Sequence, residues 1–429
     1  MATKTPAIAG KIWFRAGVAG MASYLDAAAI VSTGTALVLF KGPLGLTPMT
    51  IGLLSSLLTI SIAVGSIVGG TLGDRFGRRR VFTATMILLV IGAAVMATAS
   101  SEQLLYLGVV LLGLAAGADL PVSLALIAEI APQGARGKLV AFSQVFWYLG
   151  LIAAQTMGLF VGGLGETGAR LLYAHIVLMA VIVLLFRLRI PESRQWITAR
   201  DDLKAHTGVT GKAPAAFRQL FKKPLFSSLI ALTLFYSTFN IAANTKGQFG
   251  IYMYVTVAGT NVQTASAISL ALLFVSIAFA ILFIRLVDGP HRIRLFILGI
   301  LFAALQFAIP ATLGVTVWTL AFGYAFGTIG LAFAFEGILK VWTQESFPTL
   351  LRSTAQGTIV AVARVIAAVA ALFAPGLLAV SPNALLAALS GLVIIAGGFG
   401  LWVSRLPKAG LAEADDPVVD EAAYSTPRK

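Results

Sequence analysis

The sequence predicts an all-α integral membrane protein with twelve transmembrane helices in two pseudo-symmetric six-helix bundles. Hydrophobic residues make up 58% of the 429 residues and charged residues only 11%, whereas soluble domains carry roughly a quarter charged residues. Apolar runs recur along the whole chain at the length of ~20 residues that a helix needs to cross a bilayer. Short polar patterns also recur at an offset of about half the chain, which indicates two homologous halves.

The apolar runs divide evenly about one long polar break at residues 191–224. They cover residues 13–39, 49–72, 81–99, 104–128, 139–164 and 171–190 before the break, and 225–250, 262–286, 295–313, 317–342, 353–379 and 382–404 after it. We therefore expect an N-terminal bundle over 1–190, a cytoplasmic central loop over 191–224 and a C-terminal bundle over 225–407. Residues 408–429 are acidic and contain proline, which predicts a cytoplasmic disordered tail.

The formal net charge of +14 follows the topology of a membrane protein and does not indicate a nucleic-acid partner. Basic residues cluster in alternate loops, with nine Lys or Arg between Arg187 and Lys223, while Lys41 and Arg170 are the clear exceptions elsewhere. Basic loops stay on the cytoplasmic side, so both termini and the central loop are predicted to be cytoplasmic, in the cell membrane.

Cysteine is absent and the three histidines are far apart, so the sequence predicts no disulfide, no metal site and no cofactor. No P-loop or nucleophile triad is recognisable, which argues against an enzyme. The first apolar run has no convincing small-residue cleavage site, and we interpret it as a retained helix.

The repeated polar pattern consists of an acidic residue, a proline and an arginine at relative positions 1, 4 and 8. Its two copies, 216 residues apart, are Glu129, Pro132 and Arg136, then Glu345, Pro348 and Arg352. A second pattern, Asp74 with Arg78, recurs 214 residues later as Asp288 with Arg292. Each copy lies between two apolar runs, as expected for equivalent loops of two related halves.

These loops also carry a family resemblance. Gly73-Asp74-Arg75-Phe76-Gly77-Arg78-Arg79-Arg80 closely resembles the cytoplasmic signature of the major facilitator superfamily. The segments 129–137, 191–196 and 345–352 resemble signatures of its sugar porters, in the expected order. The resemblance implies two six-helix bundles around a central site near the membrane midplane, working by alternating access.

Charged residues at the predicted cytoplasmic helix ends are candidates for a gate. They can pair across neighbouring helices when the inner side closes and separate when it opens, although static topology anchors would show the same residues. The predicted gate comprises Asp74, Arg75, Arg78, Glu129, Arg136, Asp288, Arg292, Glu345 and Arg352.

Three acidic residues lie inside apolar runs, where a charge is costly: Asp26, Asp119 and Glu336. A buried carboxyl can take up and release a proton near neutrality, so all three are candidates for proton coupling. By resemblance, Asp26 matches the coupling acid of proton-linked sugar porters, but Val109 stands where their span-four arginine is expected. This departure favours a carboxyl pair of Asp26 with Asp119. The alternative for these two residues is a hydrogen bond that only packs helices together. For Glu336 the alternative is an ion pair with Lys340 one turn later.

Polar residues of the first, fifth and seventh runs are candidates for substrate binding. They are Tyr24, Gln144, Trp147, Gln155, Asn240, Asn244 and Gln248. By resemblance, Gln144 matches a glutamine that binds substrate hydroxyls, and amides offer each hydroxyl a donor or an acceptor. For each of these residues the alternative is packing between helices. Three roles stay open for Lys246 and Arg364: neutralising a carboxylate, binding an anion, or extending to the membrane interface.

The sequence therefore predicts a secondary active transporter of a polyol or monosaccharide, with myo-inositol as the first candidate, proton symport and a monomeric state. The stretch 23–31 resembles bacterial inositol and sugar carriers. A proton-coupled carrier of phosphate or an organic ion is the alternative, favoured by Asp119-Leu120-Pro121, Lys246 and Arg364. A membrane-embedded enzyme or a sensor is a third reading, without a catalytic cluster or a long extension to support it.

Overall fold

The computed structural model describes residues 10–132, 136–193, 197, 220–223, 225–286, 289–348 and 351–408. Most of the predicted central loop, the predicted tail beyond residue 408 and Asp288 lie outside the described residues. Asp74 and Arg136 are placed in helices, but their side chains also lie outside the description. The predictions for these segments and side chains therefore stay predictions.

The first half of the chain folds into six long helices. They are α1 (Gly10–Phe40), α2 (Pro48–Phe76), α3 (Arg78–Ala97), α4 (Glu102–Ile130), α5 (Arg136–Val161) and α6 (Glu166–Arg187). Local chemistry fixes several of the ends. The hydroxyls of Thr47 and Ser101 accept the Thr50 and Leu104 amide hydrogens at the starts of α2 and α4. Gly77, with a φ of 100°, lets α2 turn directly into α3.

The second half repeats this plan with one difference. Its helices are α9 (Leu225–Tyr252), α10 (Val262–Leu286), α11 (Arg292–Leu313), α12 (Val317–Ala334), α13 (Glu336–Ser346), α14 (Arg352–Val380) and α15 (Pro382–Arg405). In the described part of the chain, twelve helical segments are long and apolar enough to cross a membrane, with α12 and α13 forming one of them. The predicted runs agree with these segments within four residues at most ends. The exceptions are the sixth segment, which starts five residues earlier at Glu166, and the seventh, which continues seven residues further to Val257.

The sequence predicts one continuous run over 317–342, and this prediction is wrong in one respect, because the helix breaks at Phe335. Phe335 has a φ of −120° and a ψ of −114°, which ends α12, and α13 starts at Glu336. The Phe335 ring stacks on two rings of α9, with centroid distances of 5.2 Å to Tyr236 and 4.7 Å to Phe239. This aromatic cluster anchors the break, and the acidic side chain of Glu336 suits the positive end of the α13 dipole.

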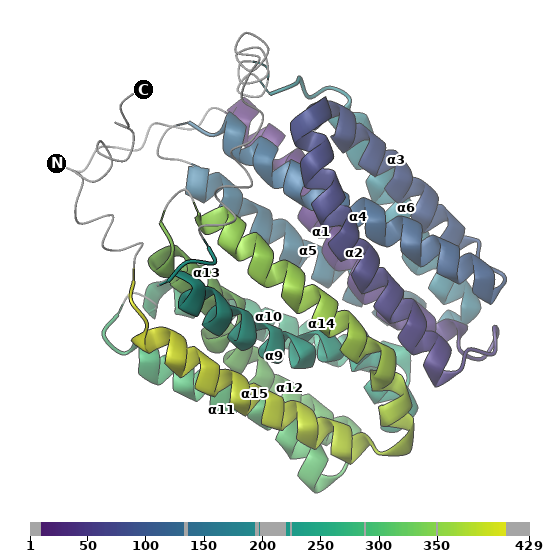
Figure 1. Ribbon diagram of the computed structural model, residues 1–429. Coiled ribbons are helices and arrows are strands. Elements are labelled where there is room, and N and C mark those ends of the chain that lie inside the picture. The colour runs from purple at the N-terminus through teal and green to yellow at the C-terminus, as the bar shows by residue number, and fades with distance from the viewer. Residues whose placement is uncertain are drawn as a thin grey trace, which may run out of the picture.

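The helices form two bundles, α1–α6 and α9–α15, that lie side by side (Figure 1). Within the first bundle, α2 and α4 pack at backbone contact: Gly65 lies against Leu114, Gly69 against Ala118, and Gly117 against Ile62. Small residues at such positions let two membrane helices approach to backbone contact. Large apolar side chains, such as those of Ile67 and Leu178, are exposed on the outside of the bundles, as expected where lipid covers them.

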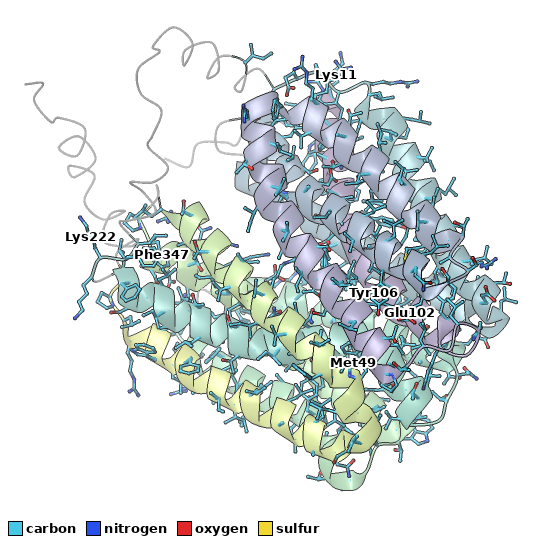
Figure 2. The ribbon with its side chains drawn as sticks, turned by 45° about the vertical axis from the view of Figure 1, so that its right-hand side comes forward. Lys11, Met49, Glu102, Tyr106, Lys222 and Phe347 are labelled. Carbon is cyan, nitrogen blue, oxygen red and sulfur yellow. The ribbon has the colours of Figure 1, made fainter. Side chains whose placement is uncertain are left out.

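The bundles touch most closely at one end of the molecule. We call the end that carries Lys11 and Lys222 the terminal face, and the end that carries Met49 and Glu102 the opposite face. Lys11 lies far from Lys222 and Phe347 at the terminal face, whereas Met49 lies where the bundles meet (Figure 2). The two bundles therefore diverge toward the terminal face.

Three glycines mark the closure at the opposite face. Gly34 of α1 lies against the Gln248 carbonyl of α9, Gly52 of α2 against the Leu372 carbonyl of α14, and Gly158 of α5 against the Ser266 hydroxyl of α10. A side chain at any of these positions would collide with the other bundle. Glycine is thus needed for the helices of the two bundles to approach at this level.

Candidate substrate and coupling site

The repeated polar patterns form equivalent ion pairs in the two bundles. In the first, Arg78 of α3 donates from Nε at 3.0 Å and from Nη2 at 2.9 Å to Glu129 of α4. In the second, Arg292 of α11 donates from Nη1 at 2.5 Å to Glu345 of α13. The internal repeat seen in the sequence is therefore also a repeat of contacts, each within its own bundle.

Neighbouring groups extend both clusters. The backbone N–H groups of Arg78 and Arg79 donate to the Glu192 carboxylate, which ties the chain after α6 to the start of α3. In the second bundle, the Lys408 ammonium lies 3.8 Å from Glu345. Burial lowers the pKa of Lys408, and the Glu345 carboxylate offsets part of that effect.

The remaining predicted gate residues make different contacts. Arg352 donates from Nε to the Phe347 carbonyl at 2.9 Å, which caps the loop between α13 and α14. Arg75 is exposed and lies beside the ring of Phe76. Opening and closing of the gate stays a prediction, because the structure shows one arrangement of these pairs.

Asp119 has a cationic partner that the sequence did not reveal. Both of its carboxylate oxygens bind the guanidinium of Arg187 from the end of α6, with Nη2 2.8 Å from Oδ2. Thr85 of α3 donates to Oδ1 at 3.0 Å, and the guanidinium lies 3.6 Å from the centre of the Phe82 ring. A buried arginine therefore compensates Asp119 inside the first bundle, while the Asp119 charge is also within range of Asp26, so the predicted role of the two carboxyls in proton coupling stays a prediction.

Asp26 lies in the middle of α1 and is fully buried. Among the described residues, neither of its carboxylate oxygens has a hydrogen-bond partner. The nearby cation is Arg364 of α14, whose Nη2 lies 4.0 Å from Oδ2. The position where the family resemblance expected an arginine, Val109, is instead a core residue. The partner cation of Asp26 thus comes from the other bundle.

Glu336 begins α13 directly after the break and pairs with Lys340 one turn later at 2.8 Å, as the alternative reading of the sequence predicted. Its side chain is 48% exposed, yet Tyr148 of α5, Tyr236 of α9 and Arg364 of α14 are all within range of its charge. A side chain that is open to solvent and surrounded by helices of both bundles lines the space between them.

Among the polar residues of α9, Gln248 connects the two bundles, whereas Asn240 and Lys246 make contacts within the second bundle. Gln248 donates from Nε2 to the Thr59 hydroxyl of α2 at 2.7 Å and to the Asn244 Oδ1 at 3.0 Å. Asn240 donates to the Ala363 carbonyl of α14 at 3.5 Å. Gln248 is buried, so it contributes to the closure at the opposite face. Lys246 lies over the Tyr324 ring of α12, 3.3 Å from its centre.

The predicted substrate residues of the first bundle lie on two helices. Tyr24 of α1 is buried, and its hydroxyl lies 2.7 Å from Nε2 of His175 on α6, a partner that the sequence did not suggest. Gln144, Trp147 and Gln155 of α5 are all half-buried. The α5 helix faces the space between the bundles, because Tyr148 is within range of Glu336.

Several buried polar atoms on α5 and α9, which border this space, have no hydrogen-bond partner among the described residues. They include Gln155 Oε1, Ser237 Oγ and Asn244 Nδ2. Buried polar groups are normally satisfied, and an acceptor, a hydroxyl and an amide donor together match the hydrogen-bonding capacity of a hydroxylated solute. The same helices thus supply an unbonded carboxyl, Asp26, and free polar groups.

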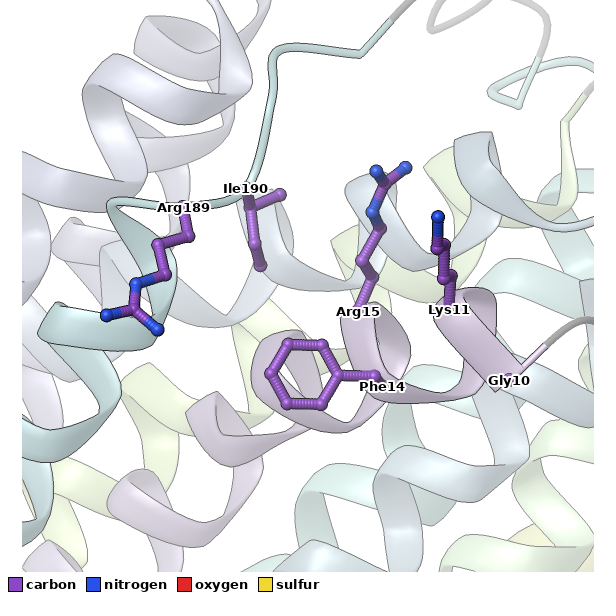
Figure 3. Close-up of a pocket in the computed structure, with 6 residues that line it drawn as sticks. All are labelled: Gly10, Lys11, Phe14, Arg15, Arg189 and Ile190. Atoms are coloured by element: carbon purple, nitrogen blue, oxygen red, sulfur yellow. The ribbon is translucent and has the colours of Figure 1, made fainter.

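A cavity of about 450 Å³ at the terminal face is a separate feature (Figure 3). It is lined by Gly10, Lys11, Phe14, Arg15, Arg189 and Ile190. The lining comes from the start of α1 and from the segment after α6, and it includes none of the predicted coupling or substrate residues. The space between the bundles, and not this cavity, is therefore the candidate site.

Comparison with known proteins identifies the family of this two-bundle arrangement. The sequence pattern of the Major Facilitator Superfamily matches residues 16–375. The chain belongs to the major facilitator superfamily. This membership confirms the predicted family, the twelve-span fold class and the prediction of a transporter in place of an enzyme.

Curated relatives are carriers of small solutes. The chain is 29% identical over 377 residues to the minor myo-inositol transporter IolF of Bacillus subtilis (strain 168), covering 83% of this chain and 82% of the relative. It is 27% identical over 380 residues to the arabinose-proton symporter of the same organism, covering 80% of each. The superfamily member described here is therefore a multi-pass membrane transporter of the sugar-porter type that moves a small-molecule solute.

Solved structures agree on the fold. A crystal structure of a D-xylose-proton symporter superposes with a TM-score of 0.74 at 20% identity, covering 93% of this chain and 98% of that one. The inward-open conformation of the xylose transporter XylE from E. coli superposes with a TM-score of 0.73 at 20% identity, covering 93% and 97%. At this identity the likeness concerns the arrangement of helices.

Proposed function

We propose that this transporter carries a polyol or monosaccharide, with myo-inositol as the first candidate, together with a proton. It acts in the cell membrane, as a monomer, with both termini in the cytoplasm. The observation that carries the proposal is the fully buried Asp26 carboxyl, which has no hydrogen bond to any described residue and lies on α1, close to Arg364 of the other bundle. A proton-accepting group next to a hydroxyl-binding site is what sugar–proton symport requires.

The proposed substrate follows from the polar side chains of α5 and α9, two helices that border this space. Amides and hydroxyls, such as Gln144, Gln155, Asn240 and Asn244, offer donors and acceptors without a net charge. Trp147 lies nearly one turn from Gln144 on the same helix and would cover the apolar face of a ring. The two relatives carry, by name, myo-inositol and arabinose, and both solutes are rich in hydroxyl groups.

The alternative of an anionic substrate loses its support, because the cations that suggested it have partners within the protein. Lys246 lies on the Tyr324 ring, Arg364 is close to Asp26, and Asp119 is bound by Arg187. No cation of this group is left over to recognise a phosphate or a carboxylate. An uncharged solute therefore fits the described residues better.

The proposal is tested by uptake of labelled myo-inositol into proteoliposomes, with unlabelled arabinose, xylose, phosphate and nicotinate as competitors. We expect polyols and sugars to compete and the two anions not to. Gln144→Ala should raise the half-saturation concentration, because a lost hydrogen bond to a solute weakens binding by about 1 kcal/mol, or roughly fivefold. Competition by phosphate alone, or an unchanged half-saturation concentration in the variant, would contradict the proposed site.

A further inference from the structure

We infer that Arg364 is the counter-ion of Asp26 and that this pair, which joins the two bundles, links the protonation of Asp26 to their relative movement. The inference rests on the proposed proton coupling and adds a positioning residue to it. Arg364 is on α14 in the second bundle and Asp26 on α1 in the first, with Nη2 4.0 Å from Oδ2. Asp26 has no hydrogen bond to either oxygen within the described part of the chain, so its charge depends on this neighbour.

The other ionisable groups around Asp26 are already accounted for. On α4 and α6, Asp119 and Arg187 bind each other, and His175 of α6 is bonded to the hydroxyl of Tyr24. On the second bundle, the pair of Glu336 with Lys340 faces the same space. The remaining groups are the neutral phenols Tyr148 of α5 and Tyr236 of α9. Arg364 is thus the described cation placed to balance an ionised Asp26.

A pair between the bundles differs physically from a pair within one. When two rigid bundles rock, distances inside each bundle stay constant, whereas the distance between α1 and α14 changes. An arginine on span four, as the family resemblance expected, would stay at the same distance from Asp26 throughout. Because Arg364 is on the second bundle, the attraction between the two charges contributes only to arrangements in which α1 and α14 are close.

Protonation removes this contribution. The proton adds to a carboxylate oxygen of Asp26, the carboxyl becomes neutral, and Arg364 keeps its charge. Glu336 is within range of the Arg364 charge, so the guanidinium retains an acidic neighbour in its own bundle after Asp26 is neutralised. Arg364 is 25% exposed, which leaves it room to move between the two acids. Loss of the proton restores the attraction between Asp26 and Arg364.

The pair is present in an arrangement whose bundles diverge at the terminal face, so ionised Asp26 should favour that divergence. The chain has no cysteine, which allows spin labels at Lys11→Cys and Lys222→Cys, one on each bundle at the terminal face (Figure 2). The label-to-label distance distribution is measured by pulsed electron resonance at pH 5 and pH 8. We expect the long-distance population to fall at pH 5 in the otherwise unchanged protein.

The variants separate the pair from general effects. Arg364→Gln should abolish the pH-dependent shift, Arg364→Lys should retain part of it, and Asp26→Asn should show the pH 5 distribution at both pH values. The matched control is Arg170→Gln, which removes an arginine whose partners, Glu166 and the Ala99 carbonyl, both lie in the first bundle, and it should shift as the parent does. A shift that persists in folded Arg364→Gln, or none in the parent, would overturn the inference. This readout needs no substrate, so failure of the proposed substrate class remains distinguishable.

Discussion

The buried pair of Asp119 with Arg187 allows a prediction about stability. In Arg187→Met the carboxylate of Asp119 keeps the Thr85 hydroxyl but loses the guanidinium that binds both of its oxygens. The side chains of both residues are almost completely buried, with exposures of 1% and 0%. Breaking such a pair from one side costs about 3–5 kcal/mol, because an uncompensated charge remains in the interior.

The matched double variant separates the charge from the packing. Asp119→Asn combined with Arg187→Met removes both charges, and replacing a whole buried pair by neutral groups is often close to neutral in stability. The double variant should therefore be more stable than Arg187→Met alone. Arg170→Met serves as the control for loss of an arginine, because its pair with Glu166 is 41% and 36% exposed and such pairs contribute about 0–1 kcal/mol.

The assay is reversible unfolding in mixed detergent micelles, followed by far-UV circular dichroism, for the parent and the three variants. We expect the order of stability to be parent and Arg170→Met, then the double variant, then Arg187→Met. If Arg187→Met lost no more stability than Arg170→Met, the reasoning that Arg187 compensates a buried charge would be refuted. A double variant less stable than Arg187→Met would refute it as well.

Two further predictions concern the ends of the bundles. Gly34→Leu should prevent closure at the opposite face, because the new side chain meets the Gln248 carbonyl. A cysteine placed at Thr59 should then react faster with a membrane-impermeant maleimide. An unchanged reaction rate would contradict the close approach of α1 and α9. Glu345→Gln should reduce net uptake while leaving substrate binding intact, because it removes the partner of Arg292. The test compares uptake with substrate binding measured by calorimetry. Equal losses of uptake and binding would argue against a gate.

Hydropathy and charge pattern predicted most of the fold. Most ends of the spans agree with the sequence within four residues, because a membrane helix must be apolar over its whole length and this requirement is visible in any window of the sequence. The break at Phe335 was missed because the apolar run continues through it; the adjacent Glu336-Gly337 in mid-span was the available signal.

The partners of the buried acids were not predictable in the same way. In the sequence, Arg187 stands with the basic residues that lead into the central loop, whereas in the structure its side chain turns back into the bundle to reach Asp119, 68 positions earlier in the chain. The role of Arg364 stays open in the sequence, because a single sequence does not tell which spans adjoin. The spacing that reveals contacts within a helix carries no information on contacts between α1 and α14.

The measurement that tests the account most directly is accumulation of labelled myo-inositol in proteoliposomes, with and without an inward proton gradient, in the parent and in Asp26→Asn. The account predicts accumulation above the external concentration only with the gradient and only in the parent, while Asp26→Asn still exchanges solute across the membrane at equal concentrations. Gradient-driven accumulation that persists in Asp26→Asn would contradict the central role of this carboxyl.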